Sequence, residues 1–192
     1  SRIKSSGYID RSGSKLRSYF LQGIYKDENT LVKLLNFAGH EITDQAWFGV
    51  DNQTLKTNRK YNFAGEYYDD KGNIMYYENQ DDNYKQDHYQ LHWNQFFENN
   101  WVSNLGLHYT HGRGYFENYN IGYDDGISKS PDFIDRRWLD NDFYGLIFSF
   151  NNSSDDYNAI IGGSYNKYEG EHFGEYLWIA DSNQLSNFKE RF

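Results

Sequence analysis

Hydrophobic and polar positions alternate one by one along residues 88–110, HYQLHWNQFFENNWVSNLGLHYT. Successive side chains of a β-strand point to opposite faces, so this alternation predicts strands with one apolar and one polar face. The alternation pauses at residues 98–100 and then resumes, which predicts a β-hairpin with strands near 84–97 and 101–112. Its apolar face would hold Tyr89, Leu91, Trp93, Leu105, Leu107 and Tyr109, and its polar face His88, Gln90, His92, Asn94, Asn104 and His108.

The register of this hairpin follows from its turn. A three-residue turn at 98–100 pairs Trp93 with Leu105 and Tyr89 with Tyr109. That register keeps both apolar sets on one face, whereas a slip of one residue would move half of them to the other face. We therefore predict these two pairs as cross-strand neighbours.

Two further hairpins are predicted on the same grounds. The first pairs 16–25 with 30–42 through a turn at 26–29, and the other pairs 142–151 with 156–166 through 152–155. In the latter, Leu146 and Phe148 join the apolar parity. The first hairpin has apolar residues on both parities, so its faces are not assigned. One more strand is expected near 173–180.

Long segments rich in Asn, Asp and Tyr, 48–83 and 113–139, separate the hairpins and are expected to be loops. Short turns on one side and long loops on the other are typical of outer-membrane barrels, and strands of about ten residues suffice to cross a bilayer. We therefore predict an all-β fold: an antiparallel meander of transmembrane β-hairpins, part of a large outer-membrane β-barrel with long extracellular loops. In this interpretation the apolar face, including Leu146 and Phe148, meets lipid, and the polar face lines a wet lumen.

The composition agrees with an all-β chain and excludes several functions. Of the 192 residues 20% are aromatic, with 17 Gly and one Pro, and aromatic residues favour strands while Asn, Asp and Gly favour turns. There is no cysteine, so neither a disulfide framework nor a thiolate metal site is possible. A net charge of −9 without a basic block argues against nucleic-acid binding. No apolar run reaches the length of a transmembrane helix.

No catalytic, metal or cofactor site is predicted. His88 and His92 would lie about 13 Å apart on a strand, too far to bind one ion together. His92 and His108 would be diagonal neighbours, which leaves a two-ligand site conceivable, but polar lumen residues are the favoured interpretation. No G-x-S-x-G elbow and no cysteine nucleophile occur, so we do not expect an enzyme.

Aromatic residues of the long segments are the candidate ligand-binding residues. Aromatic rings stack on flat or sugar-like ligands, although they would serve equally to pack one loop against another. The candidates are Tyr67, Tyr68, Tyr76, Tyr77, Tyr115 and Phe116.

Several stretches resemble the barrel region of TonB-dependent outer-membrane receptors, particularly those of Bacteroidetes. They are SSGYIDRSGSKLRSYFLQGIY (5–25), ITDQAWFGV (42–50), LKTNRKYN (55–62) and DNYKQDHYQLHWNQFF (82–97). The resemblance covers roughly residues 1–180 and rests most on GYIDR, QAWFGV and the DNY-to-HWN segment. None of these stretches is a catalytic signature.

The resemblance implies a location in the outer membrane of a Gram-negative bacterium and uptake of a scarce ligand such as a ferric siderophore, haem, cobalamin or glycan. Such receptors have a 22-stranded barrel closed by a plug domain and respond to the TonB energy-transducing complex. Neither a plug nor a TonB box is recognisable in residues 1–192, which leads us to expect a central barrel fragment of six or seven strands. Its expected partners are outer-membrane lipid, a small-molecule or metal-chelate ligand and, through the missing plug, TonB.

Two alternatives stay open from the residues alone. One is a complete small outer-membrane barrel of about eight strands with a structural or adhesion role. The other is a soluble β-sandwich that binds or cleaves carbohydrate, which would bury Tyr89, Leu91 and Trp93 beneath a second sheet.

Overall fold

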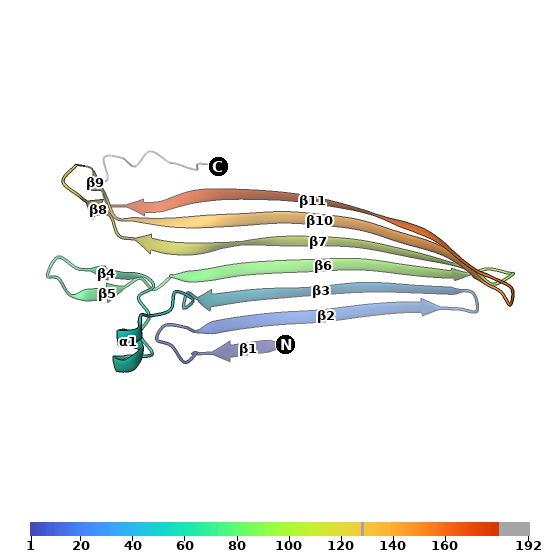
Figure 1. The fold of residues 1–192 in the computed structure, drawn as a ribbon, viewed down its shortest axis with the longest axis horizontal. Helices are drawn as coiled ribbons and strands as arrows, with labels where there is room; N and C mark the ends of the chain where they lie inside the picture. The colour runs from blue at the N-terminus through green and yellow to red at the C-terminus, as the bar shows by residue number, and fades with distance from the viewer. Residues whose placement is uncertain (128, 181–192) are drawn as a thin grey trace.

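The computed structural model describes residues 1–127 and 129–180, and most of them form one antiparallel sheet (Figure 1). The seven strands of this sheet lie in the order of the chain, so each strand pairs with the next long strand of the sequence. Their bounds are β1 Arg2–Ser5, β2 Ser14–Lys26, β3 Thr30–Asp44, β6 Asp81–Phe96, β7 Trp101–Asn120, β10 Phe133–Ser153 and β11 Asn158–Ile179. The all-β, antiparallel fold predicted from the alternation is confirmed.

The predicted hairpin registers are also confirmed. Trp93 pairs with Leu105 and Tyr89 with Tyr109 across β6 and β7. The turn between these strands places Asn99 and Asn100 at φ angles of 58° and 60°. Asparagine tolerates this left-handed region better than most residues, so the Asn-Asn pair suits the turn.

The strands run further than the sequence indicated. The segment 113–139 is not a loop: β7 continues to Asn120 and β10 begins at Phe133, so only residues 121–132 connect them. The strand expected near 173–180 is the end of β11, and β6 already starts at Asp81. Gly112 and Gly114 lie within β7, not at its end. The extra length arises because each extension pairs with its neighbour along its whole run.

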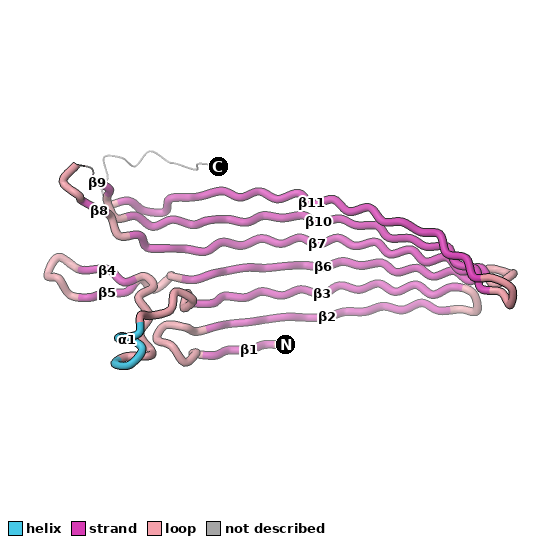
Figure 2. Tube along the Cα trace, viewed as in Figure 1, coloured by secondary structure: helices cyan, strands magenta, loops and turns pink. Residues whose placement is uncertain are grey.

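The two ends of the sheet differ in their connections. At the turn end, short turns join β2 to β3, β6 to β7 and β10 to β11. At the loop end, residues 45–80 hold α1 (Asn52–Thr57) and the short hairpin of β4 (Glu66–Tyr68) and β5 (Ile74–Tyr76). The second long connection holds β8 (Tyr123–Asp124) and β9 (Lys129–Ser130). Figure 2 shows the helical turn confined to the loop end. The expected asymmetry between short turns and long connections is therefore present.

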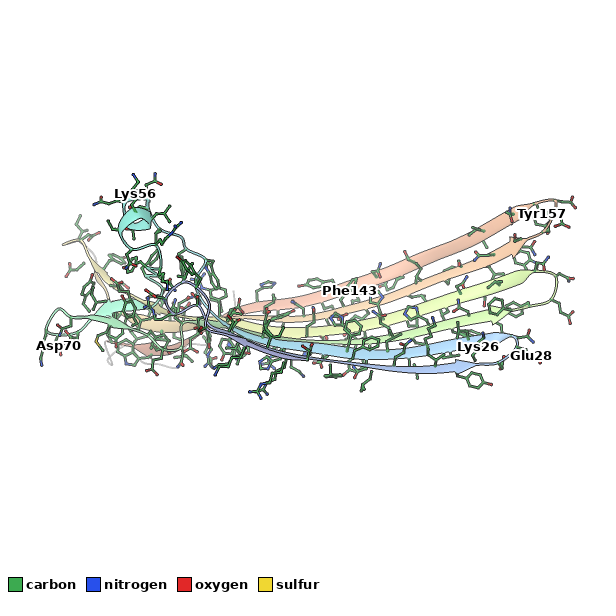
Figure 3. All side chains as sticks on the ribbon, turned by 90° about the horizontal axis from the view of Figure 1, so that it is seen from below. Lys26, Glu28, Lys56, Asp70, Phe143 and Tyr157 are labelled. Carbon is green, nitrogen blue, oxygen red and sulfur yellow. The ribbon has the colours of Figure 1, made fainter. Side chains whose placement is uncertain are left out.

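Neither face of the large sheet is covered by another large sheet in the described residues. Buried apolar side chains are few there, namely Ala38 and Ala64. Seen edge-on, the sheet bends along its strands (Figure 3). Lys56 on α1 stands to one side of the sheet, and Asp70, at the tip of the β4–β5 hairpin, extends beyond the strand ends. The fold is thus a curved ribbon of strands that exposes two faces of different chemistry.

Candidate functional site

One face of the sheet carries a continuous set of apolar side chains, which we call the apolar band. The register places Leu34, Leu91, Leu107 and Leu146 in one row across four strands, and Val32, Trp93, Leu105 and Phe148 in the next. All eight residues that the sequence assigned to the apolar face lie in this band. They remain open to the surroundings, with exposed fractions of 48% for Tyr89, 38% for Trp93 and 40% for Leu107.

A row of tyrosines limits the apolar band on the side of the loop end. The Tyr89 and Tyr109 rings lie 6.0 Å apart, and those of Tyr109 and Tyr144 lie 5.1 Å apart, all stacked. The Tyr109 hydroxyl donates a hydrogen bond of 2.7 Å to Asp142, which stands in the next row toward the loop end. On β2, β3, β6, β7 and β10, the described residues of this face carry no charge from the tyrosine row to the last pleat before the turns.

The apolar band contains a shallow groove of about 690 Å³. Its floor is opened by Gly23, which stands in the leucine row and has no side chain to fill its position. Leucines and tyrosines of four strands form the walls: Leu21, Leu34, Leu91, Leu107, Tyr89 and Tyr109. The groove is therefore a long apolar depression across β2, β3, β6 and β7.

The opposite face, which we call the polar face, holds all six residues predicted to be polar: His88, Gln90, His92, Asn94, Asn104 and His108. Three of them, His88, Asn94 and Asn104, hydrogen-bond across strands through their side chains, whereas the side chains of Gln90 and His92 lie 3.2 Å apart on the same strand. His88 Nδ1 lies 2.9 Å from Thr110 Oγ1, Asn94 donates to Asn104, and Asn104 donates to Ser149 at 3.0 Å. Burying amide and hydroxyl groups without partners costs free energy, so such ladders suit a wet surface or a polar neighbour rather than lipid.

Glycines on the polar face let neighbouring side chains lie across the sheet. A Cβ at Gly145 would come within 1.8 Å of the His108 ring, and one at Gly106 within 2.9 Å of Ile147 Cγ2. Both glycines give the adjacent side chain room that a larger residue would occupy.

The histidines do not form a metal site in the described part of the chain, where no group of three or more His, Asp or Glu side chains is placed to hold an ion. His88 makes its contacts within the sheet, including stacking on Phe37 with ring centroids 4.4 Å apart. Gln90, not His92, is the direct cross-strand partner of His108. His88 and His92 hydrogen-bond as the interpretation of a polar surface requires, whereas the His108 ring packs on Phe143 with ring centroids 4.8 Å apart, and its buried Nε2 has no hydrogen-bond partner in the described residues.

A buried ion pair lies on the apolar face beyond the tyrosine row, at the loop end. Glu117 on β7 is 1% exposed and accepts a 2.5 Å hydrogen bond from Arg136 Nε on β10. The Tyr77 hydroxyl, from the 45–80 connection, donates to the other oxygen of Glu117. Burial and this hydrogen bond raise the pKa of Tyr77 to about 12. The Arg136 guanidinium also lies 4.2 Å from the centre of the Tyr115 ring.

Buried amide side chains attach the 45–80 connection to β7. Gln45 donates to the backbone oxygen of Glu117 at 3.0 Å, and Gln80 donates to Gln45 Oε1 at 3.0 Å. Asn62 donates to the backbone oxygen of Gln45 at 2.8 Å. A buried amide needs several partners at once, so this chain of hydrogen bonds fixes the path of the connection. Sequence reasoning missed all of these residues, because single polar residues in a polar segment carry no periodic signal.

A second carboxyl group is perturbed beside the ion pair. Asp81, the first residue of β6, pairs across the sheet with Asp44 of β3. Burial, with the charges of Glu117 and Asp44, raises the pKa of Asp81 to about 6. Asp81 thus lies close enough to Glu117, Asp44 and Arg136 for their charges to act on its carboxyl group.

The six aromatic residues proposed to bind ligand do not come together as one site. Tyr115 and Phe116 are strand residues of β7, not loop residues, and as strand neighbours they point to opposite faces. Tyr115 packs on Trp138 with ring centroids 4.7 Å apart, and Phe116 has the Arg137 guanidinium at 6.0 Å.

The other four aromatic candidates belong to the β4–β5 hairpin and its end. Tyr67 stacks on Tyr119 at 4.6 Å, and the Tyr68 hydroxyl points to Glu66 at 3.5 Å. Tyr76 and Tyr77 line a groove of about 450 Å³ between this hairpin and the residues around Gln45. The groove is also lined by Arg11, whose guanidinium lies 3.5 Å from the centre of the Tyr76 ring. This groove is the concave feature at the loop end to which two of the predicted residues contribute.

No helix in the described residues is long and apolar enough to cross a membrane. Comparison of the chain with protein-family models, curated proteins and solved structures finds no match.

Proposed function

We propose that this chain is part of the β-barrel of a TonB-dependent transporter in the outer membrane of a Gram-negative bacterium. The observation that carries the proposal is the apolar band, which is continuous over the sheet and lies opposite a hydrogen-bonded polar face. Lipid requires an apolar surface with no unsatisfied backbone groups, and strands paired in a sheet satisfy those groups between them.

The height of the apolar band fits a bilayer. On β6 it runs from Tyr89 to the turn after Phe96, about nine residues, which is the length a tilted strand needs to cross the hydrocarbon core. Tyrosine is enriched at membrane interfaces because its ring is apolar and its hydroxyl polar. The row of Tyr89, Tyr109 and Tyr144 would mark one such interface. The proposed membrane-crossing segments are therefore the parts of the strands between this row and the turn end.

The remaining features take their roles from this placement. The polar face would line the barrel interior, and the loop end would lie outside the cell, because long connections of outer-membrane barrels are extracellular. The groove beside Tyr76 and Tyr77 would meet the transported ligand. A ferric siderophore, haem, cobalamin or a glycan remains the proposed class, and a plug domain and TonB remain the proposed route of energy.

The segments that carry the resemblance to TonB-dependent receptors meet in space, which supports their treatment as one unit. Arg11, in GYIDR, donates to the backbone oxygen of Asn62, in LKTNRKYN. Asn62 in turn donates to the backbone oxygen of Gln45, the start of QAWFGV. These contacts join the β1–β2 turn to both ends of the loop segment that contains α1.

The two alternatives make different structural demands. A soluble sandwich needs a second sheet over Tyr89 and Trp93, and in the described residues both side chains are exposed. A complete small barrel needs its first and last strands paired, and β1 and β11 are the two edges of the sheet. A section of a larger barrel needs neither a second sheet over the apolar band nor pairing between β1 and β11.

The test is tryptophan quenching by lipids brominated on the acyl chain, after refolding the chain into bilayers. One variant retains Trp93 as its single tryptophan, and the matched control retains only Trp47, an exposed residue of the 45–80 connection. We expect strong quenching of Trp93 and little of Trp47. Equal, weak quenching of both would reject the proposal and favour a soluble protein.

A further inference from the structure

A row of basic residues crosses the sheet on the same face as the apolar band, further toward the loop end. The register places Arg2, Arg17, His40, Lys85 and Arg113 side by side on β1, β2, β3, β6 and β7. Lys4 and Lys15 pair one pleat further on. We call the cations of these two rows, other than His40, the basic row: Arg2, Lys4, Lys15, Arg17, Lys85 and Arg113. The sequence hides this cluster, since its members are spread over more than a hundred positions in a chain of net charge −9.

The basic row is poorly neutralised by the protein itself. Within the described residues, no carboxylate lies at ion-pair distance from Arg2, Lys4, Lys15 or Arg17, and all four are exposed. Lys85 and Arg113 do have partners, Asp87 at 2.8 Å and Asp140 at 3.4 Å. Their side chains are nevertheless 59% and 55% exposed, so these pairs are screened by solvent and contribute little.

Apart from Asp87 on β6, the acidic residues level with the basic row and in the next row toward the turn end lie on β10 and β11. The same row continues from Arg113 to Asp140 on β10 and Glu171 on β11, and the next row toward the turn end carries Asp142 and Glu169 there. Within these rows, the six cations of the basic row therefore outnumber the one carboxylate, Asp87, over β1, β2, β3, β6 and β7. An anion approaching this face would find its favourable position over that half of the sheet.

The apolar groove lies on the same face as the basic row, nearer the turn end of the strands. It is formed by β2, β3, β6 and β7, and three of these four strands also contribute a cation to the basic row. Four residues separate Tyr89, at the edge of the groove, from Lys85 on the same strand, about 13 Å along the strand and roughly 10 Å once strand tilt is included. A single lipid can span this distance, with its headgroup at Lys85 and its acyl chain in the groove.

We propose that the basic row and the apolar groove together bind one phosphorylated lipid of the outer leaflet, with the phosphate on the cations and an acyl chain in the groove. The inference rests on the proposed function, because it needs the tyrosine row to lie at the outer membrane boundary. Each lysine or arginine near an anionic lipid surface contributes attraction that salt screens, and charge-assisted hydrogen bonds to phosphate add to it. The open floor at Gly23 supplies the apolar half of the site.

The experiment uses the full chain in bilayer discs of phosphatidylcholine that contain a small fraction of lipid A. The test variant combines Arg17→Gln, Lys85→Gln and Arg113→Gln. The matched control combines Lys26→Gln, Lys33→Gln and Lys71→Gln, which removes the same charge outside the basic row. Native mass spectrometry measures the lipid A retained by the chain, and lipid A without phosphate serves as the second probe.

We expect the wild-type chain and the control to retain lipid A equally, and the test variant to lose it about tenfold. Removal of the phosphates should cause a similar loss for the wild type and none further for the test variant. Displacement of lipid A by an equal concentration of inorganic phosphate would show an ion site instead and overturn the inference. Equal retention by test variant and control would also overturn it.

Quenching of Trp93 by brominated lipid is measured on the same discs. A chain that is inserted but does not distinguish phosphorylated from dephosphorylated lipid would overturn the lipid site alone. A chain that is not inserted would overturn the proposed function, and the lipid site with it.

Discussion

The two halves of each long strand differ in what surrounds them, although the backbone runs through both without a break. Between the tyrosine row and the turn end, β6 and β7 present leucine and tryptophan on one face and amides on the other. Between the tyrosine row and the loop end, the same strands present Lys85, Arg113 and the buried Glu117 on the face that was apolar. The difference teaches that alternation specifies a strand, whereas the identity of the alternating residues specifies what the strand faces.

The two halves also hold together differently. The half near the turns makes backbone ladders and side-chain rows, with apolar side chains exposed on one face. The half near the loops adds tertiary contacts from residues 45–80, including the ion pair and the amide chain. Substitutions in the two halves should therefore act through different interactions.

The largest expected effect comes from a charge placed in the apolar band. In the proposed membrane placement, Leu91→Lys should lower the free energy of unfolding from bilayers by about 2–4 kcal/mol, because a lysine near the middle of the hydrocarbon core is poorly solvated. The matched control is Gln90→Lys, one residue away on the polar face, which should change stability by less than about 0.5 kcal/mol. Urea unfolding followed by tryptophan fluorescence measures both. Equal effects of the two lysines would contradict the assignment of the faces.

The next effect tests the loop-end half. Glu117→Ala should cost about 3 kcal/mol, because it leaves Arg136 half-buried without its carboxylate and removes the acceptor of Tyr77. The matched control is Glu169→Ala, which breaks the 2.6 Å pair with Lys167 between side chains that are both about half exposed. That loss should be within about 0.5 kcal/mol. Similar unfolding midpoints for the two variants would show that the loop connection does not stabilise the sheet.

A smaller effect depends on pH and concerns Asp81, which lies outside the proposed membrane-crossing segments. Its folded pKa of about 6 stands above the ordinary value of 3.8, so the folded state is destabilised increasingly as the pH rises from about 4 to 6, and fully above 6. The shift corresponds to about 3 kcal/mol, which solvent screening of this partly buried group reduces to about 1 kcal/mol. Asp81→Asn should therefore raise stability at pH 8 and leave it unchanged below pH 4. A gain that does not vary with pH would exclude this origin.

The smallest effect is expected at α1, which packs outside both halves. Asp51 caps this helix by accepting hydrogen bonds from the backbone of Gln53 and Thr54, and these bonds hold the pKa of Asp51 below its ordinary value. Asp51→Ala should speed hydrogen exchange of those two amides and leave the unfolding of the sheet unchanged. In the wild type the same capping should be lost as the pH falls below about 4. A change in the unfolding midpoint of the sheet would show that α1 is part of the cooperative unit.

The sequence was informative where one face differed sharply from the other. Tyr89, Leu91 and Trp93 against His88, Gln90 and His92 predicted the β6–β7 hairpin and its register. Beyond residue 112 the alternation is between charged, aromatic and glycine residues, so no hydrophobic period marked the continuation of β7 to Asn120. Pairing with β10 over the whole length of that extension decides the structure there.

The contacts at the loop end could not be predicted from the sequence for a different reason: they join residues that are far apart in the chain. Glu117 is buried because Tyr77 and Gln45 reach it from a connection far away in the chain. The same holds for the basic row, whose members become neighbours through the registers of four separate strand pairs. Local patterns predict elements, but these groupings exist only after the elements pair.

The short turns at one end of the sheet have a consequence for the order in which the protein folds. Closing a short loop loses less chain entropy than closing a long one, so each hairpin should begin to pair at its turn and extend from there. For β10 and β11 that growth starts beside residues 154–157 and reaches the register shift between Ile134 and Asp135 last. Because this register shift would form last, it would not disturb the strand pairs that had already formed. The hairpin can thus complete its pairing over the apolar band before the position where its register is broken.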